Sequence, residues 1–525
     1  MELSKTLSNS IPFKNFLFKE QKHRTILWIS LGLIVIQFSV FKYFYPYASF
    51  IHDDSFEYLA TANENLDVNF YMIGYGRFLR MFSALSNSDT ILVAFQFLGI
   101  QCSALFFVFT IFYFYNPGKI VQIILLFAMV LNPLFLHLAN LISSDCLFAS
   151  LSLIWFSLLI WIINRHSVKI ILWHAVVLFL AFTVRYNALI YPFISVGILL
   201  FTKLPLGKKI VGIGACLLLC GSFVVYTSHK YKELTGYWQY SPFSGWQLAN
   251  NALYVYRYVE QGNRKEVPLN FKQLDNMVRK YFDSTRDVSK YPIEGIMAST
   301  FYMWSRGLPL MKYRDNIFKN DTSVNDFKKW ASMGPFYQEY GLYIIKKYPV
   351  HFIRYFLWPN LNRYYAPPVE FLGMYNSGKN EVPELAKNWF RYKNLKVRTR
   401  FKDNNTWVLD LYPILSGFFN VLMLCTIVCF TLLKGWRNNR EFTKGVLLGG
   451  CFWLLNALFS TGASSAALRF QSFPIQLTIT FSLLLVDWMV QVMKTIQSQS
   501  TNTTSNYSHP NHIDEPFRGN VRLKY

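Results

Sequence analysis

Carboxylate groups gather at the point where the first long hydrophobic segment of the chain ends. The tetrad His52–Ser55 (HDDS) follows that segment directly, and Glu57 and Tyr58 come shortly after it. Ionisable groups beside hydrocarbon are costly unless they are solvated or paired, so they usually mark a transport pathway or a reaction site. Carboxylates can also take a proton from a hydroxyl group. Asp53, Asp54, Glu57 and Tyr58 are therefore the first candidate site residues.

Three further polar motifs stand at the ends of later hydrophobic segments: Asp145 after two serines, Arg185 with Tyr186, and Arg469. Each has a simpler interpretation, because Asp145 suits a helix N-cap and the two arginines suit anchors at a membrane interface. The planar guanidinium group is also well shaped to bind phosphate. Together with the carboxylates of the first loop, these residues would form a site that handles both a proton and a phosphate.

Other side chains are weaker candidates for the same site. Arg77 and Arg80 are reserve phosphate ligands, and His52 with His137 could bind a divalent metal beside the first-loop aspartates. Neither a GxxxxGK[ST] phosphate loop nor a GxSxG nucleophile motif is present. The chemistry is therefore not expected to draw on cytoplasmic nucleotide hydrolysis.

The elements that must position these residues are membrane helices. Of the 525 residues, 53% are hydrophobic and only 15% are charged, which is well outside the range of soluble proteins. We predict an all-α polytopic membrane protein with about ten transmembrane helices and a mixed outer-face insert. The apolar runs lie at 25–46, 91–115, 120–142, 145–164, 169–184, 187–203, 209–227, 411–433, 444–461 and 470–493.

Charge distribution sets the orientation of these helices. The net charge of +23 comes largely from lysines and arginines in alternate loops, which fits the positive-inside rule better than nucleic-acid binding. We expect an integral plasma (inner) membrane protein with both termini in the cytoplasm and all the candidate residues on the outer face. The seven cysteines lie in or beside apolar runs, so neither a disulfide framework nor a zinc site is expected.

The chain divides into five predicted regions. Two outer segments are expected to lie on the membrane surface, an amphipathic helix at 75–85 and an aromatic stretch at 340–358. The regions are a cytoplasmic N-terminus at 1–24, a transmembrane module at 25–227 with an outer loop at 47–90, an outer-face (periplasmic) insert at 228–408, C-terminal transmembrane helices at 409–494 and a disordered cytoplasmic tail at 495–525.

The order of these motifs resembles that of C-type (GT-C) membrane glycosyltransferases. The segments DSFEYL at 54–59, SDCLF at 144–148 and TVRYN at 183–187 are similar to those of the bacterial branch related to protein O-mannosyltransferases and lipid A aminoarabinose transferases. The resemblance covers about residues 25–200 and the last helices. Here the outer domain is an insert before the last three helices, and Asp-Asp stands where many relatives have Asp-Glu.

The resemblance implies a cell-envelope hexosyl- or pentosyltransferase. Such an enzyme takes a sugar from a polyprenyl (undecaprenyl-type) phosphate and passes it to a glycan, lipid or protein acceptor. An acid of the first loop, Asp54 or Asp53, would be the base, while Arg185 and Arg469 neutralise the leaving phosphate. A single base predicts inversion at the anomeric carbon, although Asp145 leaves a covalent route open. An envelope-glycan polymerase or ligase and a lipid or solute transporter are the alternatives.

Overall fold

The computed structural model describes residues 11–165, 167–285, 287–290, 300–321, 323–464 and 466–506. Within these ranges the chain is helical, and its only β interactions are isolated bridges. The ends of the predicted N-terminal region and tail, 1–10 and 507–525, lie outside the described residues. The insert, expected to be mixed, consists of helices and loops in its described part.

Eight helical segments are long and apolar enough to cross a membrane, which confirms the architecture of an all-α, multi-pass membrane protein. The two remaining apolar helices, α10 (Val168–Val184) and α11 (Tyr191–Phe201), are shorter. The eight segments contain α3 (Gln21–Phe44), α6 (Asp89–Tyr115), α7 (Lys119–Val130) with α8 (Pro133–Asn140), α9 (Ser144–Asn164), α12 (Leu206–Thr235), α23 (Tyr412–Leu432), α24 (Arg440–Ala463) and α25 (Ser472–Asn506).

Local sequence explains where the long helices begin and end. Ser88 caps the start of α6 by accepting a hydrogen bond from the backbone of Ile91, and Asn116 ends that helix in the left-handed conformation. The predicted run at 120–142 is interrupted because Pro133 cannot continue a helix, so α8 starts again with Asn132 as its cap. The broken segment α7–α8 still packs as one unit in the bundle.

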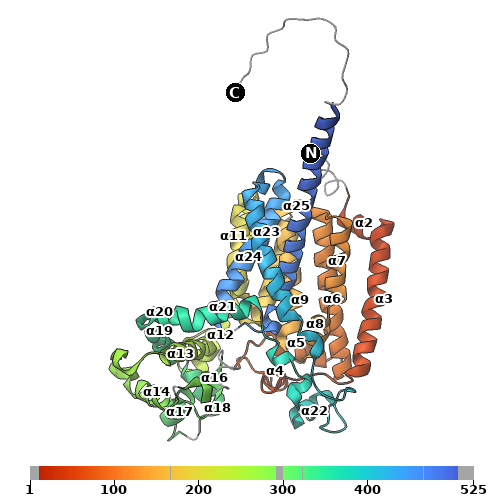
Figure 1. The fold of residues 1–525 in the computed structure, drawn as a ribbon. Helices are drawn as coiled ribbons and strands as arrows, with labels where there is room; N and C mark the ends of the chain where they lie inside the picture. The colour runs from red at the N-terminus through yellow and green to blue at the C-terminus, as the bar shows by residue number, and fades with distance from the viewer. Residues whose placement is uncertain are drawn as a thin grey trace, which may run out of the picture.

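The long helices lie side by side and alternate in direction (Figure 1). The start of α3 meets the start of α7, where Lys22 donates to Gln122 Oε1 (2.7 Å). The middle of α25 reaches the same end of the bundle, where Asp487 accepts a hydrogen bond from Gly118 (2.9 Å). Because the directions alternate, the end of α3 and the starts of α9 and α25 all lie at the other end, which we call the site end.

The first part of the insert is a helical unit with its own aromatic core. Trp246 and Trp330 stack with ring centroids 5.7 Å apart, and both are buried. Figure 1 shows this unit to one side below the bundle. It contains α13 (Pro242–Tyr256), α14 (Lys272–Ser284), α16 (Phe301–Trp304), α17 (Pro309–Ile317), α18 (Asp326–Ser332) and α19 (Gly334–Lys347), and α20 (Pro349–Phe352) leads back towards the bundle.

The second part of the insert covers the first loop. This loop forms α4 (Asp54–Glu64) and α5 (Gly74–Ser83), and α22 (Glu384–Phe390) packs on α4 in a shared apolar core. Figure 1 shows all three below the site end of the bundle. The predicted insert thus forms two units in its described part. The first loop contacts both, because Val68 and Phe70 pack on the first unit and α4 packs on the second.

Several predicted boundaries and surfaces differ from the structure. Helix α12 continues to Thr235, past the predicted edge at 227, and α25 continues to Asn506, so the described start of the tail is helical. The predicted surface helix at 75–85 instead packs its apolar side against protein, with Leu79 1% exposed. The stretch at 340–358 is split by Pro349: its first half belongs to α19, where Tyr340 is fully buried, and only its second half keeps an exposed apolar side.

Gly245 allows α13 and α19 to cross closely, since a Cβ atom there would lie 1.9 Å from the backbone oxygen of Gly334. We predict that Gly245→Ala lowers the thermal stability of the insert, by about 1–3 kcal/mol, because the two helices must separate. Tryptophan fluorescence during thermal unfolding will measure this. Gly262→Ala is the control because a Cβ atom there meets open space. Equal stability of the two variants would contradict the close packing.

Candidate active site

The two adjacent aspartates of the first loop have different positions. Asp53 has φ 73° and ψ −62°, an uncommon conformation for a residue with a side chain, and Asp54 then opens α4. Such a conformation costs of the order of 1–3 kcal/mol and persists where the surrounding structure imposes it. The turn leaves Asp53 exposed and turns Asp54 towards the bundle, where it is partly buried. The structure therefore distinguishes the two candidates.

Both carboxylate oxygens of Asp54 are occupied. Arg469 donates from Nη2 to Oδ2 (2.7 Å), and the hydroxyl group of Tyr71 donates to Oδ1 (2.6 Å). Burial and the neighbouring Asp54 carboxylate raise the pKa of Tyr71 well above its usual value, so this phenol stays protonated. Asp54 is thus held as an acceptor between a cation and a neutral donor.

A second carboxylate lies beside the same arginine. Asp145 is 1% exposed and pairs with Arg185, while Nη1 of Arg469 lies 3.7 Å from its Oδ2 atom. Ser143 caps α9 and also donates to the Asp145 carboxylate. Ser143 therefore holds the capping position that the sequence suggested for Asp145, and Asp145 lies in the first turn of α9 as part of a charged cluster.

Aromatic rings fix the planes of the two guanidinium groups. The Cζ atoms of Arg185 and Arg469 each lie 4.6 Å from the centroid of the Phe470 ring. The ring of Phe371 lies 4.6 Å from the Cζ atom of Arg469. Arg469 is 8% exposed, and its Nε atom is buried without a hydrogen-bond partner among the described residues. One N–H donor of this arginine is therefore left without a hydrogen bond in the part of the chain that the structure describes.

A short backbone pairing holds the two aspartates in register. Ser49, just before the tetrad, donates its N–H to Asn140 O (2.8 Å) and accepts from Ile142 N (2.9 Å). Asp89, at the start of α6, accepts from the neighbouring Ala48 N (2.7 Å). The loop that leads to Asp54 is therefore tied to the turn that leads to Asp145.

A segment of the insert, which we call the strap (residues 375–379), closes over this loop from the other side. Tyr375 donates to Ala48 O (3.1 Å), Asn376 N donates to Ser49 Oγ (2.9 Å), and Ser377 Oγ donates to Phe50 O (3.2 Å). Asn376 and Ser377 have φ values of 48° and 52°, and Gly378 has 78°. Three left-handed residues in a row give the strap a bend that fits the loop.

The remaining substrate-binding candidates line the same region. The hydroxyl group of Tyr58 lies 2.9 Å from Ser144 Oγ, one residue before Asp145, and burial raises the pKa of Tyr58 to about 12. Glu57 accepts from Asn69 Nδ2 (3.0 Å), and burial raises its pKa as well. The ring of Tyr186 stacks on Phe243, with centroids 5.9 Å apart, where the bundle meets the insert.

Four candidates have partners outside the charged cluster. Arg77 pairs with Asp67 (2.8 Å), and Arg80 donates to Ala62 O near the end of α4 (2.9 Å). Nδ1 of His52 lies 2.9 Å from Lys379 Nζ, whereas His137 packs edge-on against Phe41 and Tyr45. In the described part of the chain, no three His, Cys, Asp or Glu side chains gather to hold a metal. The two histidines are thus not brought together.

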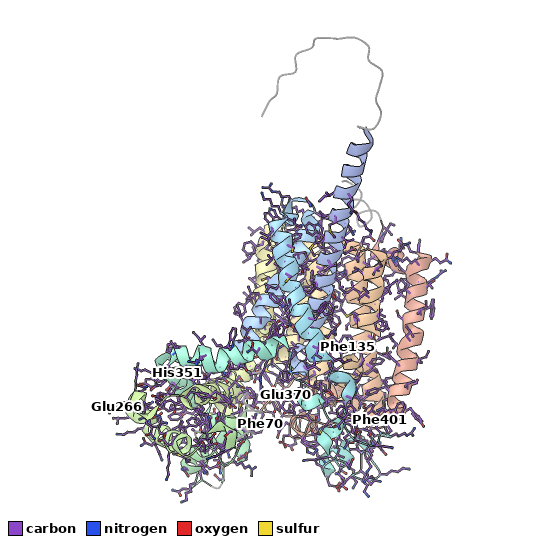
Figure 2. The ribbon with its side chains drawn as sticks, in the orientation of Figure 1. Phe70, Phe135, Glu266, His351, Glu370 and Phe401 are labelled. Carbon is purple, nitrogen blue, oxygen red and sulfur yellow. The ribbon has the colours of Figure 1, made fainter. Side chains whose placement is uncertain are left out.

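The structure adds residues that the sequence did not single out. The only sequence feature that could have marked Tyr71 as a site residue is its place in the first loop. No sequence feature marks Phe371. Glu370, next to Phe371, pairs with Arg363 (3.3 Å) and interacts electrostatically with Arg469. Figure 2 shows Glu370 between the bundle and the two parts of the insert. A third carboxylate and a third arginine therefore border the cluster.

No family model matches the chain, and neither the curated proteins nor the solved structures include a significant match. The chemical reading of the site thus depends on its own geometry. The cluster offers a carboxylate that can accept a proton, guanidinium groups that can bind an anion, and a wall of aromatic rings. It lies at the site end of the helices that are long and apolar enough to cross a membrane.

We predict that Asp145→Asn strongly destabilises the protein, because Arg185 and Arg469 lose a shared, buried counter-charge. Breaking a buried pair typically costs about 3–5 kcal/mol. The apparent melting temperature in detergent will measure the effect. Glu441→Gln is the control because its pair with Lys444 lies at the surface, with side chains 53% and 34% exposed, and such pairs contribute about 0–1 kcal/mol. Similar shifts for both variants would show that the cluster is not a stabilising unit.

A second prediction concerns the pH dependence of stability. Burial raises the pKa of Glu370, with Arg363 and Arg469 opposing the shift, so the folded state holds this proton more tightly than the unfolded chain. The resulting stability is present below the ordinary pKa of glutamate and is lost as the pH rises through the raised value. Glu370→Gln, which stays neutral, should therefore melt increasingly above wild type as the pH rises. Glu384→Gln, on the exposed surface of α22, is the control, and a pH-independent gap would contradict the prediction.

Proposed function

We propose that this protein is a GT-C-like membrane glycosyltransferase that moves a sugar from a polyprenyl phosphate to an acceptor on the outer face of the plasma membrane. The observation that carries the proposal is the sharing of Arg469 between Asp54 and Asp145 at the site end of the helices. The proposal keeps ten membrane crossings, with α10 and α11 as the two short ones. The charged side chains suit a sugar phosphate that enters from the lipid.

Asp54 is the base in this proposal. It takes the proton of an acceptor hydroxyl group while the acceptor oxygen forms a bond to the anomeric carbon, and the bond from that carbon to the phosphate oxygen breaks. The electron pair of the broken bond leaves with polyprenyl phosphate. The carboxylate is oriented by two hydrogen bonds, from the hydroxyl group of Tyr71 to Oδ1 and from Arg469 to Oδ2. Attack opposite the leaving group inverts the anomeric carbon.

Arg469 and Arg185 stabilise the leaving phosphate. In the structure Nη2 of Arg469 is engaged by Oδ2 of Asp54. A donor phosphate that bonds to the arginine would compete with Asp54 for its N–H groups. The Nε atom of Arg469, which has no hydrogen-bond partner among the residues that the structure describes, is a further donor for the phosphate. Donor binding would therefore leave Oδ2 of Asp54 free to face the acceptor hydroxyl group.

We predict that Asp54→Asn lowers sugar transfer by about 10²–10⁴-fold while donor binding is kept, because the amide cannot accept the proton. The measurement is release of labelled sugar from polyprenyl-phosphate donors by the purified protein, with donor binding followed in parallel. Asp53→Asn should cost far less, since that side chain is exposed.

Two results would contradict the proposal. A larger loss in Asp53→Asn than in Asp54→Asn would assign the base to the other aspartate. A second contradicting result is that the wild-type protein releases no sugar from any monosaccharide donor. That result would favour either a polymerase that uses lipid-linked oligosaccharides or a transporter. Those two are then separated by testing transfer from an oligosaccharide donor.

A further inference from the structure

A continuous helix crosses the bundle at its site end. It consists of α20, a π-helical turn at Ile353–Leu357, and α21 (Trp358–Tyr365). Figure 1 shows it running across the direction of α23, α24 and α25, and Figure 2 marks His351 near its beginning. Pro349 starts this helix and separates it from α19. Its first part packs on α13 of the insert, and the ring of Tyr258, just after α13, stacks on that of Tyr355 with centroids 4.0 Å apart.

One side of this transverse helix packs on protein. Phe356, Asn360 and Tyr364, spaced four residues apart, are 3%, 6% and 5% exposed. The other side carries a stripe of large apolar or aromatic residues that are 41–71% exposed: Val350, Ile353, Trp358 and Leu361. A stripe of this kind on the surface of a protein indicates a partner, and on a helix it is typical of a membrane interface.

Contacts of the last turn show how deep the helix lies. The carbonyl oxygen of Tyr365 accepts hydrogen bonds from Ser416 Oγ (3.3 Å) and Asn420 Nδ2 (3.1 Å). These residues are four and eight positions after Tyr412, where α23 begins. At 1.5 Å per residue, Tyr365 therefore lies about 6–12 Å along the spanning helix from its site end.

The bundle makes room for the transverse helix at this depth. A Cβ atom on Gly417 would lie 3.1 Å from the ring of Tyr365, which is tighter than an ordinary contact. The surrounding surface of α23 and α24 is apolar and exposed, with Phe418 60% and Leu458 63% accessible. The stripe is thus continuous with the surface that the spanning helices present to lipid.

We infer that the helix 349–365 is immersed in the leaflet at the site end, with its apolar stripe in contact with lipid. Its first turn lies near the headgroups, where the exposed Arg354 can reach phosphate, and its last turn reaches the acyl chains. The backbone polar groups of a helix are satisfied internally, so this placement has no unpaired backbone in hydrocarbon. The partner surface is the bilayer itself.

The test places trifluoromethylphenylalanine at Ile353, Trp358 or Leu361 in the full chain, which is then assembled into lipid nanodiscs for fluorine NMR. Phe418 is the matched lipid-facing control, and Leu269, 85% exposed on the insert, is the water-facing control. A doxyl-labelled phosphatidylcholine should broaden the signals at 353, 358 and 361 several-fold more than the signal at 269. A water-soluble gadolinium chelate should do the reverse.

Signals at 358 and 361 that respond like the one at 269 would overturn the inference. A second measurement needs no substitution: phosphatidylcholine with a diazirine in its acyl chain is photoactivated in nanodiscs of the wild-type protein. Cross-links should map to 349–365 as well as to α23 and α24. Labelling of α23 and α24 without any in 349–365 would equally overturn the inference.

Discussion

The structure of the site depends on one arginine that is the counter-charge of two carboxylates. Arg469 lies against Asp54 and Asp145, and Arg185 completes the cluster from the end of α10. Buried charges are tolerated only when they are paired and hydrogen bonded, so each member requires the others to be in place. The four residues come from four separate segments of the chain. The helices that carry them must therefore end at the same level.

Backbone contacts, more than side-chain charges, set that level. The pairing of Ser49 with Asn140 and Ile142 aligns the two acids, and the strap holds the same segment from the opposite side. These contacts hold Asp53 in an unfavourable backbone conformation with a positive φ angle. The charged groups thus meet in a geometry that the surrounding loops impose, which is the arrangement that preorganised electrostatic sites require.

Hydropathy and charge predict the all-α, multi-pass architecture and the common end of the bundle that Asp54, Asp145, Arg185 and Arg469 share, because both patterns reflect local solvation. Hydropathy and charge do not predict features that depend on tertiary contacts. The apolar side of α5 has the same periodicity whether it meets lipid or protein, and the structure packs it on protein. Tyr71 and Glu370 are brought to the cluster by the path of the loops that carry them. The spacing of residues in the sequence does not predict that path. The difference between Asp53 and Asp54 likewise depends on a backbone turn that neighbouring identical residues do not reveal.

The ion pair between Asp54 and Arg469 joins residues 415 positions apart in the chain. A membrane protein is made from its N-terminus, and domains generally fold in that order. The first loop therefore emerges long before the strap, and the strap before the last helix. Until Arg469 is in place, Asp54 lacks its counter-charge, and the rings of Phe371 and Phe470 have no guanidinium group to pack against. The cluster is consequently completed late in biosynthesis, and a chain truncated before residue 469 lacks it however well its earlier helices are inserted.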